Sequence, residues 1–154
     1  MNSERPMADK LKIKILRDGA SVPAYATEGS AGLDLACASA EPVTVPAHGI
    51  AKIPTGIAAE CERRDAALLI FARSGLATKH GISLANGVGV VDPDYRGEII
   101  VSVLNNSAED YVIPPGERIA QLVVVPFVRT DVEVVGELSD TERGAGGFGS
   151  TGKV

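Results

Sequence analysis

The sequence predicts an all-β fold: a jelly-roll-like double-sheet β-barrel with one short helical turn and a flexible glycine-rich C-terminal arm. Short runs of β-branched residues recur between glycines and prolines. Most of their spacings are near the 8–12 residues, roughly, that are typical of all-β sandwiches and barrels. No segment shows a 3.6-residue apolar period long enough for a core helix. Both observations favour two packed sheets over a helical class.

The expected strands follow one another along the chain. Residues 12–16 alternate polar and apolar side chains, which is the period of a half-buried strand. Residues 31–36 place Asp34 between apolar neighbours, which also favours a strand. The remaining expected strands are residues 42–45, 49–53, 56–61, 66–72, 88–91, 99–104, 110–113 and 119–128, with one more over residues 132–135. Residues 74–79 are the best candidate for a helical turn.

Length and composition favour one domain. A chain of 154 residues with 45% hydrophobic and 23% charged residues is typical of a soluble globular protein. We expect residues 1–154 to form a single domain, in which a disordered N-terminus (1–10) precedes a β core (11–135) and a mobile arm (136–154). No apolar run approaches the roughly 18 residues that cross a bilayer, and the N-terminus has no hydrophobic secretion signal. We therefore expect a cytoplasmic protein whose two cysteines are reduced.

The net charge of −5 constrains how the protein binds phosphate groups. A nonspecific nucleic-acid binder would normally show a basic patch, which this balance argues against. An acidic protein can still bind phosphates through a few arginines, backbone N–H groups and a bridging cation. The charge therefore limits the manner of binding and leaves the ligand open.

Residues 86–98 carry the most informative pattern in the chain. Two apolar runs flank a turn-rich centre at residues 92–97, which favours a β-hairpin. Hairpin turns usually carry small polar residues, whereas this one also holds Asp92, Tyr95 and Arg96. A carboxylate, an aromatic ring and a guanidinium suit a pocket that binds a flat ligand and places a general base beside it. An ordinary surface hairpin with a Pro-Asp turn is the alternative.

Three further segments hold polar side chains that need partners. Arg73 precedes the helical turn, where Ser74 is a good N-cap and the remaining N–H groups can bind an anion. Gln121 lies in a strand rich in valine and leucine, where an amide needs hydrogen-bond partners. A lone carboxylate such as Asp34 is more often a satisfied structural acceptor than a ligand.

The glycine-rich end, residues 143–152, contains five glycines, one arginine, one phenylalanine and a Ser-Thr pair. Glycines let backbone N–H groups approach phosphate oxygens, arginine matches phosphate bidentately, and a phenylalanine face stacks on a base. We favour a tail that orders over a nucleotide. A floppy terminus is the alternative.

Taken in order, five motifs closely resemble those of the trimeric deoxyuridine triphosphate nucleotidohydrolases (dUTPases). They are residues 31–36 (Ala-Gly-Leu-Asp-Leu-Ala), 73–77 (Arg-Ser-Gly-Leu-Ala), 86–98 (Asn-Gly-Val-Gly-Val-Val-Asp-Pro-Asp-Tyr-Arg-Gly-Glu), 116–121 (Gly-Glu-Arg-Ile-Ala-Gln) and 143–152 (Arg-Gly-Ala-Gly-Gly-Phe-Gly-Ser-Thr-Gly). The resemblance covers about residues 11–152, and five motifs in the family's order make it specific. Ala72 departs from the pattern, because many members carry proline there.

The resemblance implies a jelly-roll homotrimer whose three active sites each draw on all three chains, with neither nucleic acid nor membrane as a partner. It implies the reaction dUTP + water → dUMP + pyrophosphate, with Mg²⁺ held mainly by the substrate phosphates and water. This activity limits uracil incorporation into DNA and supplies dUMP for thymidylate synthesis.

The resemblance also implies a role for residues of each motif. Asp92 would be the catalytic base that deprotonates the attacking water. Uracil and deoxyribose would contact Asn86, Val90, Val91, Tyr95, Ile100 and Phe148, with Tyr95 under the sugar and Phe148 from another chain covering the base. The phosphates would contact Arg73, Ser74, Gly75, Gln121, Arg143, Ser150 and Thr151. Asp34 would lie near the phosphates and the metal, either acting on the metal indirectly or as a structural carboxylate.

Two alternatives use the same fold. A deoxycytidine triphosphate deaminase needs a glutamate placed for proton transfer at the base, and it usually has phenylalanine where Tyr95 stands. The tyrosine and the Gly-Gly-Phe-Gly-Ser-Thr tail therefore favour the dUTPase. A catalytically silent nucleotide-binding or interaction module is the other alternative, against which the presence of Asp92 and Gln121 argues.

Overall fold

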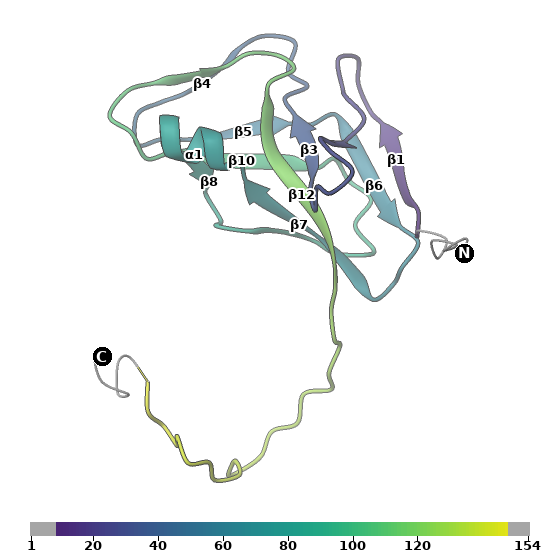
Figure 1. The fold of residues 1–154 in the computed structure, drawn as a ribbon, viewed down its shortest axis with the longest axis vertical. Helices are drawn as coiled ribbons and strands as arrows, with labels where there is room; N and C mark the ends of the chain where they lie inside the picture. The colour runs from purple at the N-terminus through teal and green to yellow at the C-terminus, as the bar shows by residue number, and fades with distance from the viewer. Residues whose placement is uncertain (1–8, 148–154) are drawn as a thin grey trace.

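The computed structural model describes residues 9–147 of the chain. It confirms the mostly β, jelly-roll-like architecture, with antiparallel pairing throughout (Figure 1). The largest sheet has the order β2 (Ala24–Tyr25), β3 (Leu33–Ala36), β12 (Arg118–Pro126), β7 (Ala66–Ala72), β9 (Gly89–Val91). The second has the order β5 (Ile50–Pro54), β10 (Ile100–Asn105), β8 (Ile82–Leu84). Two short sheets pair β1 (Leu11–Ile15) with β6 (Ile57–Cys61) and β4 (Val43–Val45) with β11 (Tyr111–Ile113).

The sheets enclose one hydrophobic core and do not close into the barrel that we expected. Strand β7 reads Ala-Ala-Leu-Leu-Ile-Phe-Ala, and this near-continuous apolar run lies between β12 and β9, where it has a neighbour on both edges. Strand β1 instead alternates, with its leucine and first isoleucine half-buried and its lysines exposed, as an edge strand requires. The largest fully buried side chains are Leu35, Ile53, Ile57, Ile82, Ile113, Ile119 and Leu122.

The expected helical turn is helix α1 (Ser74–His80). Buried Leu76 holds it against the core, and Gly81 ends it with a left-handed φ of 70°. A glycine is needed at this cap because a Cβ there would lie 3.1 Å from the backbone nitrogen of Ser107. At seven residues, α1 is the only helix in the described part of the chain, and it is far too short to cross a membrane.

The last strand, β12, ends at Pro126, and the chain then runs away from the sheets (Figure 1). The further strand that we expected over residues 132–135 is therefore wrong: Val132, Val134 and Val135 are all exposed. A strand forms only when its backbone and side chains find partners, and this arm meets none in its own sheets.

Candidate active site

The turn segment of residues 86–98 does not form the hairpin that we expected. Strand β9 pairs with β7, whereas β10 pairs with β5 and, beyond its middle, with β8. The two arms therefore belong to different sheets, because each finds a longer or more buried partner than the other arm. Between them lies a pocket of about 270 Å³. Its lining includes Asn86, Val90, Val91, Asp92, Tyr95 and Ile100.

Two unpaired strand edges border this pocket, which we call the base pocket. Strand β9 is the last strand of its sheet, so one side of its backbone has no strand partner among residues 9–147. On β10, the pairing with β8 covers only Val103 to Asn105 and leaves Ile100 beyond it. The side chains of Val90 and Ile100 are 64% and 50% exposed. The outer edge of β9 and the part of β10 around Ile100 therefore border the pocket without a strand partner among residues 9–147, while farther along β10 the Ser102 carbonyl accepts a hydrogen bond from the Ala85 N–H. Backbone groups without a strand partner are available to bind a ligand.

Tyr95 folds back over the turn beside this pocket. Its hydroxyl donates a hydrogen bond of 2.9 Å to the carbonyl oxygen of Glu98, and its backbone N–H donates to that of Asp92 at 3.1 Å. Gly97 makes this possible, because a Cβ there would overlap the Tyr95 hydroxyl. The Asp92 carboxylate is exposed at the start of the same turn. The turn thus holds an aromatic ring and a solvent-accessible carboxylate at the pocket's edge.

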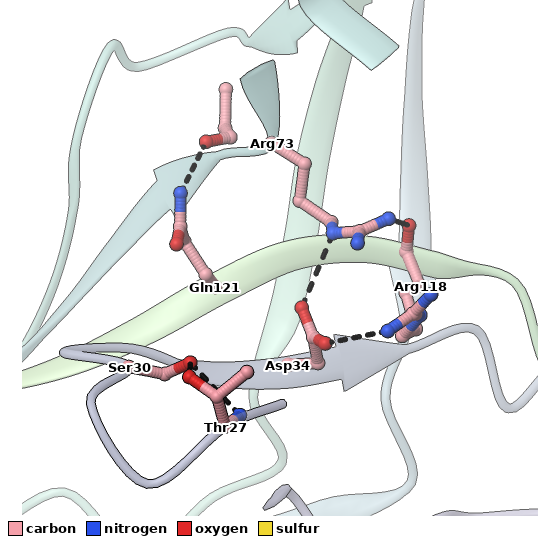
Figure 2. A network of polar contacts seen from close by, with 7 residues as sticks. Thr27, Ser30, Asp34, Arg73, Arg118 and Gln121 are labelled. Carbon is pink, nitrogen blue, oxygen red and sulfur yellow. Dashed lines mark hydrogen bonds and ion pairs between the residues drawn. The ribbon is translucent and has the colours of Figure 1, made fainter. Parts of the chain in front are cut away.

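A second pocket lies on the largest sheet and collects the predicted phosphate-binding residues, so we call it the phosphate pocket. Asp34 on β3, Gln121 on β12 and Phe71 on β7 are register partners across three adjacent strands. Cross-strand partners point to the same face, so the three side chains form a row. The lining includes Asp34, Phe71, Arg73, Ser74, Gly75 and Gln121. Gln121 donates a hydrogen bond of 3.0 Å to the Ala72 carbonyl, which fixes its amide (Figure 2).

Asp34 bridges two arginines in this pocket (Figure 2). Its Oδ1 lies 3.2 Å from Nε of Arg73, and its Oδ2 accepts a hydrogen bond of 3.0 Å from Nη1 of Arg118. Arg73 also donates through Nη1 to the Arg118 carbonyl oxygen at 3.1 Å. Arg73 is therefore held by two acceptors, and the Asp34 carboxylate is neutralised by two cations.

The start of α1 differs from our prediction by one residue. Arg73 is the N-cap, with extended φ of −87° and ψ of 129°, and no side chain caps the helix. Ser74 is the first helical residue, so the N-cap role that we expected for it is wrong. Its side chain is exposed and borders the phosphate pocket.

The described residues contain no group of three or more His, Cys, Asp or Glu side chains placed to hold a metal ion. In the phosphate pocket, Asp34 already pairs with two arginines. This donor set does not form a protein cage for Mg²⁺, which prefers several oxygen ligands and retains water. It fits a metal that is held by a ligand's own phosphates.

The base pocket and the phosphate pocket share no lining residue. Ile70 lines the first and Phe71 the second, and successive side chains on a strand point to opposite faces. Arg143 lines neither pocket: it follows β12 by seventeen residues and donates from Nε to the Gly146 carbonyl at 2.9 Å. Phe148, Ser150 and Thr151 lie outside the described residues. One chain thus presents two separate groups of predicted site residues.

Three residues at these pockets were not assigned from the sequence: Arg118, Glu98 and Arg17. Arg118 and Glu98 lie inside quoted motifs, and an arginine three residues before Gln121 could have been recognised as a second cation. Arg17 lies far from every motif, and its contact with Glu98 spans 81 residues. No local pattern could have revealed it.

Comparisons with known proteins agree with this geometry. The family model for dUTPase matches residues 18–152. A deoxyuridine 5'-triphosphate nucleotidohydrolase of Psychrobacter cryohalolentis is 51% identical over 145 residues, covering 93% of this chain and 94% of that protein. The corresponding protein of Desulfitobacterium hafniense is 47% identical over 145 residues, covering 93% of this chain and 96% of that protein.

Solved structures are similar in fold as well. The dUTPase of Staphylococcus bacteriophage 80alpha with dUPNHPP superimposes with a TM-score of 0.85 at 27% identity, covering 94% of this chain and 99% of that one. A dUTPase from phage phi11 of S. aureus, described with a structural Mg(II) ion, has a TM-score of 0.76 at 23% identity and covers 85% of this chain and 99% of that one. With five ordered motifs, a family model over most of the chain and relatives at about half identity, the chain belongs to the dUTPase family, the deoxyuridine 5'-triphosphate nucleotidohydrolases.

Proposed function

We propose that the protein hydrolyses dUTP to dUMP and pyrophosphate, with water attacking the α-phosphorus in line with the leaving pyrophosphate. The observation that carries this proposal is the slot between the free edges of β9 and β10, with Asp92 and Tyr95 at its rim. Through this reaction the protein would limit uracil incorporation into DNA and supply dUMP for thymidylate synthesis.

Base selection would rest on the backbone of the slot. Uracil presents a carbonyl and an N–H where cytosine presents an amine and an acceptor. Backbone groups of Val90, Val91 and Ile100, with the Asn86 side chain, line this pocket and would supply the matching donors and acceptors. A mismatched base would leave buried polar groups unpaired, at a cost of roughly 1–3 kcal/mol each. The methyl group of thymine would be excluded sterically if residues 86–98 close against C5 of the base.

Sugar recognition and water activation would both depend on the turn at residues 92–97. The Tyr95 ring would pack under the deoxyribose and leave no room for a 2′-hydroxyl. The exposed Asp92 carboxylate would accept a hydrogen bond from the attacking water and take its proton. A carboxylate is a weak base, so much of the rate would come from positioning and from electrostatic stabilisation of the phosphates.

The phosphate pocket would bind the triphosphate. Arg73, held by Asp34 and the Arg118 carbonyl, would use its remaining N–H groups for phosphate oxygens. Gln121, Ser74 and Gly75 would add neutral donors beside it. Arg143, Ser150 and Thr151 would complete the phosphate contacts from the arm, and Phe148 would cover the uracil. This set favours binding of an oxygen-rich anion through the guanidiniums of Arg73 and Arg143 and several dipoles.

Mg²⁺ would enter with the substrate. The described residues offer no carboxylate cage, so we propose that the phosphates and water hold the ion and that Asp34 acts on it only indirectly. A bound divalent cation offsets phosphate charge and polarises the phosphoryl oxygens. EDTA should therefore abolish turnover, and added Mg²⁺ should restore it.

We also propose that the active enzyme is a homotrimer in which each site combines different chains. The base pocket and the phosphate pocket open on opposite faces of one chain's sheet. The arm carries exposed Val128, Val132, Val134 and Leu138, which is unusual for residues without a partner. A neighbour's phosphate pocket and a third chain's arm would complete each base pocket.

Pyrophosphate release from a panel of nucleotides tests the reaction. We expect rapid release from dUTP and little release from UTP, dTTP or dCTP. Ammonia release from dCTP would instead identify a deaminase, and binding without any turnover would identify a silent module.

Mixed oligomers test the shared site. Asp92→Asn and Arg73→Met chains are each expected to be nearly inactive alone. After mixing and subunit exchange, some sites combine Asp92 from one variant with Arg73 from the other, so activity should rise above that of both parents. Activity that does not rise in demonstrably mixed oligomers would place both residues of a site in one chain.

A further inference from the structure

Glu98 closes the turn that carries Asp92 and Tyr95, and both of its carboxylate oxygens are engaged. Oε1 accepts a hydrogen bond of 2.9 Å from the backbone N–H of Gly56. Oε2 lies 2.5 Å from Nη2 of Arg17. The side chain is only 16% exposed and lines the base pocket. A carboxylate so placed needs a counter-charge, because few waters reach it.

The partner side of this contact is built by close packing. The Leu16 N–H donates to the Gly56 carbonyl oxygen at 2.8 Å, which brings the loop after β1 against Gly56. Gly56 has a φ of +69°, and a Cβ there would lie 2.8 Å from Cγ of Arg17 and 2.6 Å from Cβ of Ala20. The aliphatic part of Arg17 therefore packs directly on Gly56. This packing places the Arg17 guanidinium next to the Glu98 carboxylate.

The main chain of Glu98 contacts the Tyr95 side chain. The Glu98 carbonyl oxygen is the acceptor for the Tyr95 hydroxyl at 2.9 Å. The next residue, Ile99, is held by its N–H to the Ile57 carbonyl at 2.9 Å and accepts from Thr55. Arg17, Glu98 and Tyr95 thus form one chain of contacts that runs from the loop after β1 to the rim of the base pocket.

We propose that Arg17 is a positioning residue: by holding the Glu98 carboxylate it fixes the carbonyl that orients Tyr95, and so it sets the discrimination between deoxyribose and ribose. The inference rests on the proposed role of Tyr95 under the sugar. Without Arg17, the Glu98 side chain keeps one backbone donor and turns towards water. The peptide that carries the Glu98 carbonyl is then held from the Ile99 side alone, through the Ile99 N–H and the Ile57 carbonyl. The acceptor of the Tyr95 hydroxyl gains freedom to move, and room opens at the 2′ position.

The test measures kcat/KM for dUTP and for UTP in four proteins: wild type, Arg17→Met, Arg17→Lys and Arg63→Met. Arg63→Met is the matched control, because Arg63 is similarly exposed (41% against 44%) and pairs with Asp65 away from the base pocket. We expect the dUTP preference to fall about tenfold in Arg17→Met, since small misplacements of positioning groups have effects of this order. Arg17→Lys, which keeps the charge, should retain part of the preference for dUTP over UTP. Arg63→Met should show the wild-type preference.

An unchanged preference in Arg17→Met, with or without a lower Tm, would overturn the proposal and leave the contact merely structural. Where Arg17→Met fails to fold, Glu98→Gln decides, because its neutral amide still occupies the same space: the preference should fall, and an unchanged preference overturns the proposal. Failure of the proposed hydrolysis is a separate result, seen as wild type that releases no pyrophosphate from dUTP. In that case calorimetry with dUMP and UMP measures the same preference in the same variants without chemistry.

Discussion

Replacing Asp34 with asparagine separates two roles for this carboxylate, positioning Arg73 or acting on the metal. The substitution preserves size and removes the charge that faces Arg73 at 3.2 Å and Arg118 at 3.0 Å. The first contact is an ion pair whose side chains are 30% and 20% exposed, so it contributes about 1 kcal/mol, the upper end of the range for such pairs. The Arg118 side chain is 56% exposed, so that contact contributes only about 0.5 kcal/mol.

The sum, about 1.5 kcal/mol, is the free energy that can serve to place Arg73 on a phosphate. Its loss corresponds to a decrease of about 12-fold in kcat/KM for dUTP. Arg118→Met should have a smaller effect, because Arg73 keeps its contact with Asp34. Asp110→Asn is the control, since Asp110 lies outside both pockets and accepts a hydrogen bond of 2.8 Å from the Ala47 backbone N–H.

The assay is pyrophosphate release as a function of Mg²⁺ concentration. If Asp34 positions Arg73, kcat/KM falls at every Mg²⁺ concentration and the half-activating concentration stays at its wild-type value. A raised half-activating concentration, with full activity recovered at high Mg²⁺, would refute this reasoning and assign Asp34 to the metal.

Three other outcomes are expected. Asp92→Asn should bind dUTP with near-normal affinity in calorimetry while turnover falls by about 10²–10⁴-fold, the usual contribution of a general base; near-normal turnover would remove Asp92 from that role. Truncation after Gly136 should leave a folded trimer with severely reduced kcat, and unchanged kinetics would mean that the arm takes no part. Burial, with a hydrogen bond to Glu117, raises the pKa of Tyr111 to about 12. The neutral phenol is therefore favoured in the folded state, so this stability is present below pH 10 and is lost towards pH 12. Urea midpoints should fall more steeply over that range in wild type than in Tyr111→Phe, and parallel curves would contradict the assignment.

The sequence predicted the elements better than their partners. Apolar periods and punctuation located most strands, and helix α1 was expected within one residue of its end. Predicting which strands pair was harder, because each strand edge can pair with any of several other strands in the fold. Residues 88–91 and 99–104 carry a strong local hairpin pattern, yet the first segment pairs with β7 and the second with β5, in different sheets. The local sequence pattern contains no information about these more distant pairing partners.

The same limit applies to the site. Each motif could be recognised because its residues are contiguous, and the structure gathers them into the two pockets. Arg17 and Glu98 are 81 residues apart, and their contact depends on the glycine at position 56 lying between them. Ser74 was misassigned as the N-cap because its side chain favours that position, while the extended backbone of Arg73 takes it.

The open surfaces of residues 9–147 coincide with the motifs. The outer edges of β9 and β10 belong to the third motif, the phosphate pocket around Asp34 and Gln121 to the first and fourth, and the exposed Arg143 to the fifth. Had β9 and β10 paired, as the local pattern indicates, their backbone groups would satisfy each other and no edge would remain to recognise a base. Unpaired backbone groups and exposed valines are costly in a single chain. Their presence at these positions therefore supports the proposed contacts with substrate and with other chains. The absence of the expected hairpin is thus the most informative result, because the separation of β9 and β10 into different sheets creates the pocket that the third motif lines.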